Sequence, residues 1–512
     1  MNVADEHSRS LWMDETPAID AEPIVVNEHC DVVIVGSGIA GLSCAYELAR
    51  FDRSVIVIDR GTIGSGMTAR TTAHLASALD DYYSELIRIH GEDQARLYHE
   101  SQVAAINRIE AVCRDENIEA DFARLDGYLF AARDQDRADL EEEYSACRKL
   151  GIDVQWAERA PFPSGETGKC LRFADQARVH PTKYLKGLAK AIEDRGGRFF
   201  ADTAFVAAEE RSGRVTITTE RGPAITAAAA IFATNSPVND RVALHTKEIP
   251  RRTYAMAGLI PKGSIPDALY WDTLEAYHYV RLQPYDEASD WLIVGGEDHR
   301  SGEAADMERR FADLEAWARE RCPSFRSAQY RWSGQVLEPI DFMPFTGRNP
   351  GTENTFVHTG DSGQGITNGV LAGLVILPLL LGEHSRFAGI LEPSRKPVGL
   401  PALKEFAAGQ MRAARNMAEH LGPSEVSSVD DIAPGEGAIL RDGTVKKLAV
   451  YRTEDGSLVR RSASCTHVGC IVHWNPFEKC WDCPCHGSQF APTGEVLNGP
   501  ALHPLPKEEP RQ

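Results

Sequence analysis

Short apolar runs and amphipathic stretches alternate along the chain from residue 30 onward. A compact β-branched run at 30–36 predicts a buried strand, the pattern at 41–50 predicts a helix, and the run at 54–59 predicts a second strand. Later patterns repeat this alternation, a helix followed by two strands, at 181–197, 214–220 and 229–235. The predicted fold class is therefore α/β, and α+β overall.

The pattern changes towards the end of the chain. Residues 402–421 have helical spacing of their apolar positions, and Gly422 and Pro423 end the predicted helix. Short strand and turn patterns follow, which are typical of a small β-rich module. We therefore place a domain boundary near residues 423–428.

The longest apolar run, residues 370–381, contains Pro378 and is much shorter than the roughly 20 residues that cross a bilayer. We interpret it as a buried helix and expect no transmembrane segment. The N-terminus has no apolar stretch after a basic start, so no secretory signal is visible. The cytoplasm is the expected location.

Composition narrows the possible functions. A chain of 512 residues predicts about three units at roughly 150 residues per domain. The net charge of −20 opposes contacts with a phosphate backbone, so we set nucleic acid aside as a partner. Five of the 11 cysteines lie between Cys465 and Cys485, and such clustering in a cytosolic chain points to a metal rather than to a disulfide framework.

A glycine turn follows the first predicted strand. Gly36, Gly38 and Gly41 form the pattern GxGxxG, and Asp59 ends the second strand. The glycines permit a tight turn and close approach of backbone to a pyrophosphate, and the acid can accept hydrogen bonds from a ribose. The pattern predicts dinucleotide binding without separating FAD from NAD.

The cysteine cluster contains C-x-H and C-x-x-H, each on a separate loop. Cys465 and His467 belong to the first, and Cys483 and His486 to the second. Two thiolates and two imidazoles are the ligands of an asymmetric [2Fe–2S] centre. A zinc site is the alternative, but zinc fingers place both histidines together on a helix.

Residues 428–506 resemble a Rieske domain of the cytochrome bc type. The resemblance implies that Cys465 and Cys483 bind one iron, that His467 and His486 bind the other, and that Cys470 and Cys485 form a disulfide. Cys480 has no role in that family. Such domains carry a tyrosine two residues after Ser488, where this chain has Phe490, and the lost hydrogen bond to a ligand sulfur predicts a potential below the upper limit of about +300 mV.

Residues 30–385 resemble the FAD-dependent amine and amino-acid oxidoreductases, the D-amino-acid-oxidase-like or glycine/sarcosine-oxidase-like family. The segments that carry the likeness are GSGMTARTTAHL (64–75), ARVHPTKYLKGLAKAIEDRGG (177–197), AAIFATN (229–235) and TGDSGQGITNG (359–369). The resemblance implies FAD as cofactor. The FAD contacts that it implies are Gly36, Gly38, Ile39, Ala40, Gly41, Asp59, Arg60, Gly66, Thr68, Arg70, Thr72, Phe205, Thr234, Gly360, Asp361, Gly363, Gln364, Gly365, Ile366 and Thr367.

Together the two resemblances imply a Rossmann-like FAD-binding domain with an inserted antiparallel-sheet substrate domain, followed by a small all-β Rieske domain. The implied units are an N-terminal arm (1–29), the oxidoreductase region (30–390), a helical linker (391–427) and the Rieske domain (428–512). The FAD-binding segments are about 30–90, 178–240 and 345–385, and the substrate domain is about 91–177 and 241–344.

The implied function is oxidation of a small amine or amino acid at its C–N bond, with hydride transfer to FAD and single electrons passing to the cluster and then to a ferredoxin, a quinone or oxygen. Tyr279 and Arg281 are the candidate substrate residues, with Arg281 able to clamp a carboxylate, and His74 is a candidate to face the flavin. The oligomeric state is left open.

Three alternative functions make different demands on the sequence. A two-nucleotide reductase would need a second GxGxxG before residue 350, and there is none. A Rieske oxygenase usually needs two histidines spaced His-x₄-His, and no pair among the 16 histidines has this spacing. A redox relay or sensor without amine turnover remains compatible with the sequence.

Overall fold

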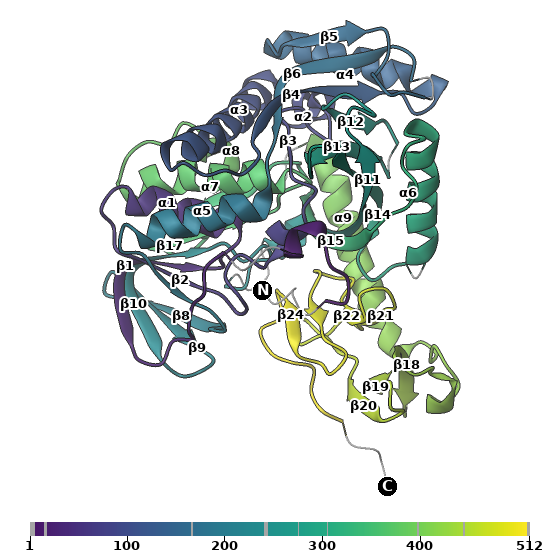
Figure 1. Cartoon of the computed structure of the whole chain (residues 1–512). Coiled ribbons are helices and arrows are strands. Elements are labelled where there is room, and N and C mark those ends of the chain that lie inside the picture. The colour runs from purple at the N-terminus through teal and green to yellow at the C-terminus, as the bar shows by residue number, and fades with distance from the viewer. Residues whose placement is uncertain are drawn as a thin grey trace.

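The computed structural model describes residues 6–14, 18–164, 167–239, 244–274, 276–304, 306–396, 399–443 and 446–508. Two large sheets with their helices form the body of the molecule, and the C-terminal residues form a smaller β domain beside it (Figure 1). The predicted class, a Rossmann-like region with a second sheet and a small all-β domain, is confirmed.

The first sheet has a parallel centre in the order β17-β10-β1-β2-β7. Its strands are β1 (Glu28–Val35), β2 (Val55–Ile58), β7 (Arg198–Phe200), β8 (Phe205–Arg211), β9 (Arg214–Thr219), β10 (Ala224–Phe232), β16 (Phe345–Arg348) and β17 (Thr355–Thr359). The second half of β1 and all of β2 are buried runs of Val and Ile, as expected for parallel strands covered on both faces.

Three helices pack beside this sheet: α1 (Ile39–Ala49), α5 (Pro181–Glu193) and α7 (Gly365–Leu380) (Figure 1). Every residue of α1 is buried, because α5 and α7 pack against it. The apolar run at 370–381 lies in α7, which is buried over most of its length, so this prediction is confirmed. None of the helices in the described ranges is both long enough and apolar enough to cross a membrane.

The second sheet runs β15-β11-β14-β13-β12-β4-β6-β3, with β5 paired to β6. It is antiparallel except where β12 pairs with β4. Its strands are β3 (His74–Leu75), β4 (Ala123–Phe130), β5 (Val154–Ala157), β6 (Cys170–Arg178), β11 (Glu248–Pro261), β12 (Leu269–Asp272), β13 (Tyr279–Pro284), β14 (Ser289–Arg300) and β15 (Tyr330–Pro339). The helices in or next to this part of the chain are α2 (Tyr83–His90), α3 (Glu92–Asp115), α4 (Arg137–Leu150) and α6 (Met307–Arg321).

The C-terminal domain consists of two small antiparallel sheets. Their strands are β18 (Glu436–Asp442), β19 (Lys446–Arg452) and β20 (Leu458–Ser462), then β21 (His473–Asn475), β22 (Cys480–Asp482), β23 (Gln489–Phe490) and β24 (Val496–Asn498). The short helix α8 (Ala388–Leu391) and the long helix α9 (Gly399–Ala418) precede this domain, and α9 runs from the body towards it (Figure 1).

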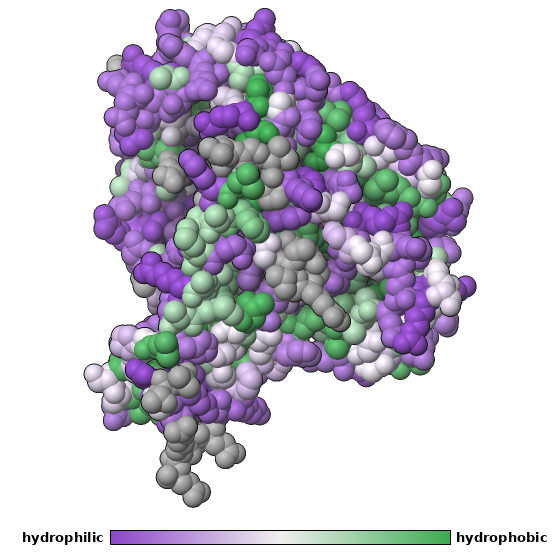
Figure 2. Space-filling model, turned by 180° about the vertical axis from the view of Figure 1, so that it is seen from behind, coloured by the Kyte–Doolittle hydropathy of each residue, from purple (hydrophilic) through white to green (hydrophobic). Residues whose placement is uncertain are grey.

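Helix α9 covers the body with one side only. Met411 and Met417 are 69% and 47% exposed, and Leu421, just beyond the helix, is 66% exposed. From behind, apolar residues form a band that leads from the body to the protruding C-terminal domain (Figure 2). The side chains of Met411, Met417 and Leu421 therefore face solvent.

Residues 6–14 of the predicted N-terminal arm are packed against the rest of the molecule. Residues 6–14 pass between the body and the C-terminal domain, and Glu6, Ser8 and Trp12 are buried. The Trp12 indole donates a hydrogen bond of 2.6 Å to the carbonyl oxygen of Thr71. The sequence indicated only a polar arm, because the groups that bind it lie far away in the chain.

Candidate functional site

The turn after β1 is shaped by its glycines. Gly36 has a φ of 103°, and a Cβ at this position would lie 2.2 Å from the carbonyl oxygen of Ala233. A Cβ on Gly41 would lie 1.9 Å from the carbonyl oxygen of Gly36. Neither position accepts a side chain, so β1 and α1 approach closely and α1 begins at the wall of a large cavity.

The cavity brings most of the predicted FAD contacts together, although they come from distant segments. The N-terminal end of α7 meets the start of α1 there, and a helix N-terminus favours negative charge. This arrangement fits a dinucleotide. The predicted contacts that line the cavity are Gly36, Gly38, Ile39, Ala40, Asp59, Gly66, Thr68, Arg70, Thr72, Thr234, Asp361, Gly363, Gln364, Gly365 and Ile366.

Five predicted contacts lie elsewhere. Arg60 and Phe205 line a second, smaller cavity, which shares Gly36, Asp59 and Thr234 with the large one. Gly41, Gly360 and Thr367 line neither cavity.

Asp59 supports the glycine turn directly. One carboxylate oxygen accepts hydrogen bonds from the Ser37 backbone N–H at 2.7 Å and from the Ser37 hydroxyl at 2.6 Å. The other oxygen accepts from the Gly61 N–H at 3.1 Å. Asp59 therefore fixes the turn that separates the two cavities, and its contact with a ribose stays a prediction.

The guanidinium of Arg70 is engaged by other protein groups, and its contact with FAD stays a prediction. Its guanidinium is fully buried, lies 3.0 Å from the Glu6 carboxylate, and donates to the Ser8 hydroxyl at 2.9 Å. Glu478 of the C-terminal domain is 3.4 Å away. Arg70 lines the cavity, but its guanidinium forms ion pairs with the N-terminal segment and the Rieske domain.

His74 and Tyr279 both line the cavity. Their rings meet edge to face at 5.3 Å, and the Tyr279 hydroxyl lies 3.1 Å from the Thr253 hydroxyl. Burial, helped by the charge of Arg281, lowers the pKa of His74 to about 3, so its imidazole is neutral. These two residues stay candidates for contact with substrate or flavin.

The position of Arg281 contradicts our expectation that it clamps a substrate carboxylate. It is fully buried, does not line the cavity, and donates to the carbonyl oxygens of Ala73 at 2.6 Å and Val179 at 3.0 Å. Its guanidinium also lies over the ring of Trp12. The side chain holds β13 against neighbouring segments instead of facing a substrate.

Sequence reasoning missed an acidic group in the cavity. Asp80, Asp298 and Glu338 line it, and the Tyr277 hydroxyl donates to Asp80 at 2.7 Å. Burial raises the pKa of Asp80 to about 6 and that of Asp298 to about 7. Glu338 is paired with Arg251. No local motif marks these residues, because each comes from a different segment of the chain.

The cluster residues converge in the C-terminal domain. Cys465 and Cys483 are buried, and the rings of His467 and His486 are 5.0 Å apart. His467 Nε2 and His486 Nδ1 are buried without a hydrogen-bond partner. Two thiols and two imidazoles with unpaired nitrogens fit a [2Fe–2S] cluster that takes two ligands on each iron.

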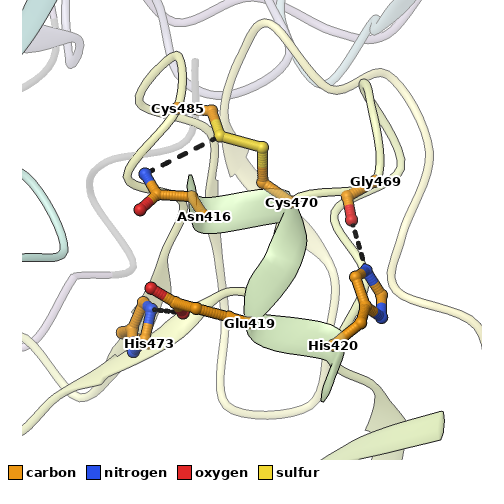
Figure 3. Close-up of a disulfide and its surroundings, with 7 residues drawn as sticks. All are labelled: Asn416, Glu419, His420, Gly469, Cys470, His473 and Cys485. Carbon is orange, nitrogen blue, oxygen red and sulfur yellow. Dashed lines mark hydrogen bonds and ion pairs between the residues drawn. A yellow bond between two sulfur atoms is a disulfide. The ribbon is translucent and has the colours of Figure 1, made fainter. Parts of the chain in front are cut away.

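A disulfide joins the two cluster loops, as the resemblance implied. It links Cys470 and Cys485, with Cα atoms 6.5 Å apart. The end of the α9 region packs on this bridge: Asn416 lies 3.9 Å from the Cys485 sulfur, and the imidazole of His420 lies 2.8 Å from the Gly469 carbonyl oxygen (Figure 3). Helix α9 therefore supports the loops from outside.

Ser488 and Phe490 lie beside the cluster loops. The Ser488 hydroxyl accepts from the Ala501 N–H at 3.0 Å, and Phe490 is fully buried in the apolar core of this domain. Cys480, the extra thiol, is also fully buried and contacts Asp482.

Changing Phe490→Tyr is expected to raise the reduction potential of the cluster by about 60 mV. A hydrogen bond to a charged sulfur contributes about 1.5 kcal/mol, and about 1.4 kcal/mol corresponds to 59 mV for one electron. A redox titration followed by EPR measures the shift. Ser488→Ala should move the potential in the opposite direction, and a wild-type value near +300 mV would contradict the argument.

Two family models match the chain: an FAD dependent oxidoreductase model (DAO) over residues 31–377 and a Rieske [2Fe-2S] domain model over residues 408–509. The first covers more than half of the chain. The chain belongs to the FAD-dependent oxidoreductase (DAO) family. It carries a Rieske domain, so FAD and a [2Fe–2S] cluster are its cofactors.

One relative of this DAO-family protein matches it over nearly its whole length. This chain is 31% identical to the "Putative Rieske 2Fe-2S iron-sulfur protein YhfW" of Bacillus subtilis, over 98% of both chains. This chain is also 27% identical to gamma-glutamylputrescine oxidoreductase of Escherichia coli, over 70% of this chain and 85% of that one. Glycine oxidase from Geobacillus kaustophilus has the same fold, with a TM-score of 0.62 at 19% identity, over 73% of this chain and 100% of that one.

In this DAO-family protein the cluster histidines of the Rieske domain lie against the oxidoreductase region. The ring of His245, just before β11, lies 4.8 Å from that of His467 and 5.8 Å from that of His486. Gln335 of β15 lines the large cavity and donates to the Gly487 carbonyl oxygen at 2.7 Å. Gly487 directly follows His486, so one residue connects the cavity wall with a cluster loop.

A buried ionic network holds the same interface together. Arg252 of β11 donates to the Asp482 carboxylate at 3.0 Å, and both side chains are almost completely buried. Arg252 also donates to Ser333 at 2.9 Å. Glu478 accepts from Ser8 at 2.6 Å and pairs with Arg70. Charged groups of the oxidoreductase region, the N-terminal segment 6–14 and the Rieske domain thus neutralise one another.

Proposed function

We propose that this protein oxidises an amine at its C–N bond and passes the electrons singly from the flavin to its own Rieske cluster. The observation that carries the proposal is the position of the cluster histidines: their half-buried rings lie 4.8 Å and 5.8 Å from the ring of His245, on the oxidoreductase region. Bound FAD supplies a centre that accepts a hydride and releases its two electrons one at a time. The protein supplies position and charge, and it holds the two cofactor-binding regions in contact with each other.

Gln335 supports the route. Its side chain is 4% exposed, its amide nitrogen binds the Gly487 carbonyl oxygen, and its amide oxygen accepts from Asn498 at 2.5 Å. These bonds fix the cluster loop against the wall of the flavin cavity. The imidazole edges therefore serve as the inlet for electrons, and an external acceptor, a ferredoxin, a quinone or oxygen, takes them from the cluster.

The charges in the cavity favour an amine over an amino acid. Arg70 and Arg251, the two arginines in the described lining, are paired with acidic side chains, and His74 is neutral. Within the described lining, both arginine side chains are thus already paired with acids and His74 carries no charge, so neither kind of group is left to pair with a substrate carboxylate. Asp80 and Asp298 face it together with aromatic rings, a combination that attracts a positively charged group.

Anaerobic mixing with a panel of amines and amino acids tests this function. We expect an amine to bleach the flavin absorbance first and to produce the EPR signal of the reduced cluster afterwards. Bleaching without cluster reduction would contradict the internal route. Failure of every amine to bleach the flavin would support a redox relay or sensor instead.

Asp298→Asn is expected to raise the KM for a cationic amine by about ten- to a hundredfold, since a bond to a charged group contributes about 1.5–3 kcal/mol. Because burial raises the pKa of Asp298 to about 7, the carboxylate forms as pH rises through 7, and the wild-type KM should fall over that range. The variant should lose this pH dependence. Asp313→Asn, on the exposed side of α6, is the control.

A further inference from the structure

The second cavity lies between the flavin-binding part and the Rieske domain. One wall consists of Asp59, Arg60, Phe205 and Val238. The other wall is formed by β24 and the loop after it, residues 497–502. Gly36, Asp59 and Thr234 belong to both cavities, so the two spaces meet at the glycine turn.

We propose that the 497–502 loop of the Rieske domain is part of the FAD-binding site and closes over the adenosine end of the cofactor. A dinucleotide whose pyrophosphate lies at the glycine turn extends in two directions from it. The larger cavity takes one arm, where the candidate substrate residues lie, and the smaller cavity takes the other. This inference rests on FAD binding and is independent of which substrate is oxidised.

The chemistry of the smaller cavity suits a purine. Phe205, Val238, Leu497 and Leu502 offer apolar surface to a flat ring. Asn498 and the backbone of Gly499 add polar groups at its edge. Aromatic and aliphatic walls with a few polar groups are typical of sites for small organic ligands.

The loop is held in place by contacts on both sides. Leu502 packs against the apolar cluster of the first sheet that contains Phe205 and Val238. A Cβ on Gly499 would lie 3.1 Å from Val238 Cγ1, so the backbone passes close to the flavin-binding part. Asn498 donates to Gln335 of β15 at 2.5 Å.

The same loop reaches the cluster. The Ala501 N–H donates to the Ser488 hydroxyl at 3.0 Å, and Ser488 follows the C-x-x-H ligands by two residues. FAD binding and the position of the Rieske domain are therefore coupled, and by linkage each stabilises the other. A flavin that lost its adenosine arm would lose this coupling.

The test uses the full chain with its cluster intact and its flavin removed, and measures binding of FAD and of FMN by quenching of flavin fluorescence. Leu502→Glu places a carboxylate in the wall and is expected to weaken FAD binding by about tenfold or more, with Leu502→Ala showing a smaller loss. Binding of FMN, which has no adenosine arm, should change little in either variant. Leu421→Glu, at a position 66% exposed, is the control.

EPR of the cluster shows whether the Rieske domain of each variant is folded. If Leu502→Glu loses the cluster, Leu502→Ala with an intact EPR signal decides the question. FAD affinity within twofold of wild type in a variant with an intact cluster overturns the proposal. Equal losses for FAD and FMN also overturn it, because the loop would then act through the whole fold and not on adenosine.

Discussion

Replacing Arg252 with methionine is expected to separate the two redox centres while leaving each of them in place. Arg252 is fully buried and faces Asp482 at 3.0 Å and Glu6 at 3.6 Å. Its removal leaves buried carboxylates without their counter-charge. Such a loss costs about 3–5 kcal/mol, and about 3 kcal/mol corresponds to a hundredfold change in an equilibrium.

The loss should fall mainly on the docking of the Rieske domain, because Arg252 and Asp482 belong to the two sides of the interface. Stopped-flow absorbance should show normal bleaching of the flavin by substrate and cluster reduction slowed by about tenfold or more. Arg252→Lys keeps the charge but cannot reach both Ser333 and Asp482 with one ammonium group, so an intermediate rate is expected.

Arg309→Met provides the matched control, because Arg309 lies on α6 with 80% of its side chain exposed and pairs with Asp313 on the same helix. Unchanged cluster reduction in Arg252→Met would show that the buried network does not set the electron route. Flavin and iron contents of all variants should match those of the wild type.

The glycine turn and the cluster ligands could be predicted because their requirements are local. Gly36 and Gly41 are read from a pattern of six residues, and the steric contacts of the two confirm why no other residue fits. Cys465, His467, Cys483 and His486 lie in two short loops that the chain itself brings together as neighbours of one disulfide. Short spacing in sequence leaves few ways to arrange such groups.

Arg281 shows where a pattern stops being informative. Tyr279 and Arg281 lie two positions apart on β13 and so share one side of the sheet. Of the two, Tyr279 lies at the cavity, whereas Trp12 of the N-terminal segment lies against the guanidinium of Arg281. No local pattern predicts that a polar segment from the start of the chain occupies this place.

Asp80, Asp298 and Glu6 were missed for a related reason. Each is a single acid in a segment without a motif, and its importance comes from neighbours far away in sequence, such as Tyr277 for Asp80 and Arg70 for Glu6. Burial raises the pKa of Glu6 to about 7, although Arg70 opposes the change. Burial and partners far away in sequence determine the pKa values of such groups, and the local sequence predicts neither.

Changing Cys483→Ser is expected to abolish turnover with a one-electron acceptor by removing the cluster. Cys483 is buried beside Cys465, and a serine hydroxyl replaces the thiolate that iron requires. Reduction of the flavin by substrate should continue at close to its wild-type rate, because the large cavity contains no residue of the cluster loops. The variant therefore isolates the first half of the reaction from the second.

Cys480→Ser is the matched control for this variant. Cys480 is equally buried, lies three residues away in β22, and contacts Asp482 instead of a cluster ligand, so the iron content and the EPR signal should persist. Steady-state assays with a one-electron dye and with oxygen distinguish two outcomes for Cys483→Ser. If Cys483→Ser loses activity with the dye and with oxygen, the cluster is the outlet for all electrons, as the contact of its histidines with His245 suggests. Full activity with oxygen in the absence of the cluster would mean that the flavin is emptied directly, and the internal route would then be wrong.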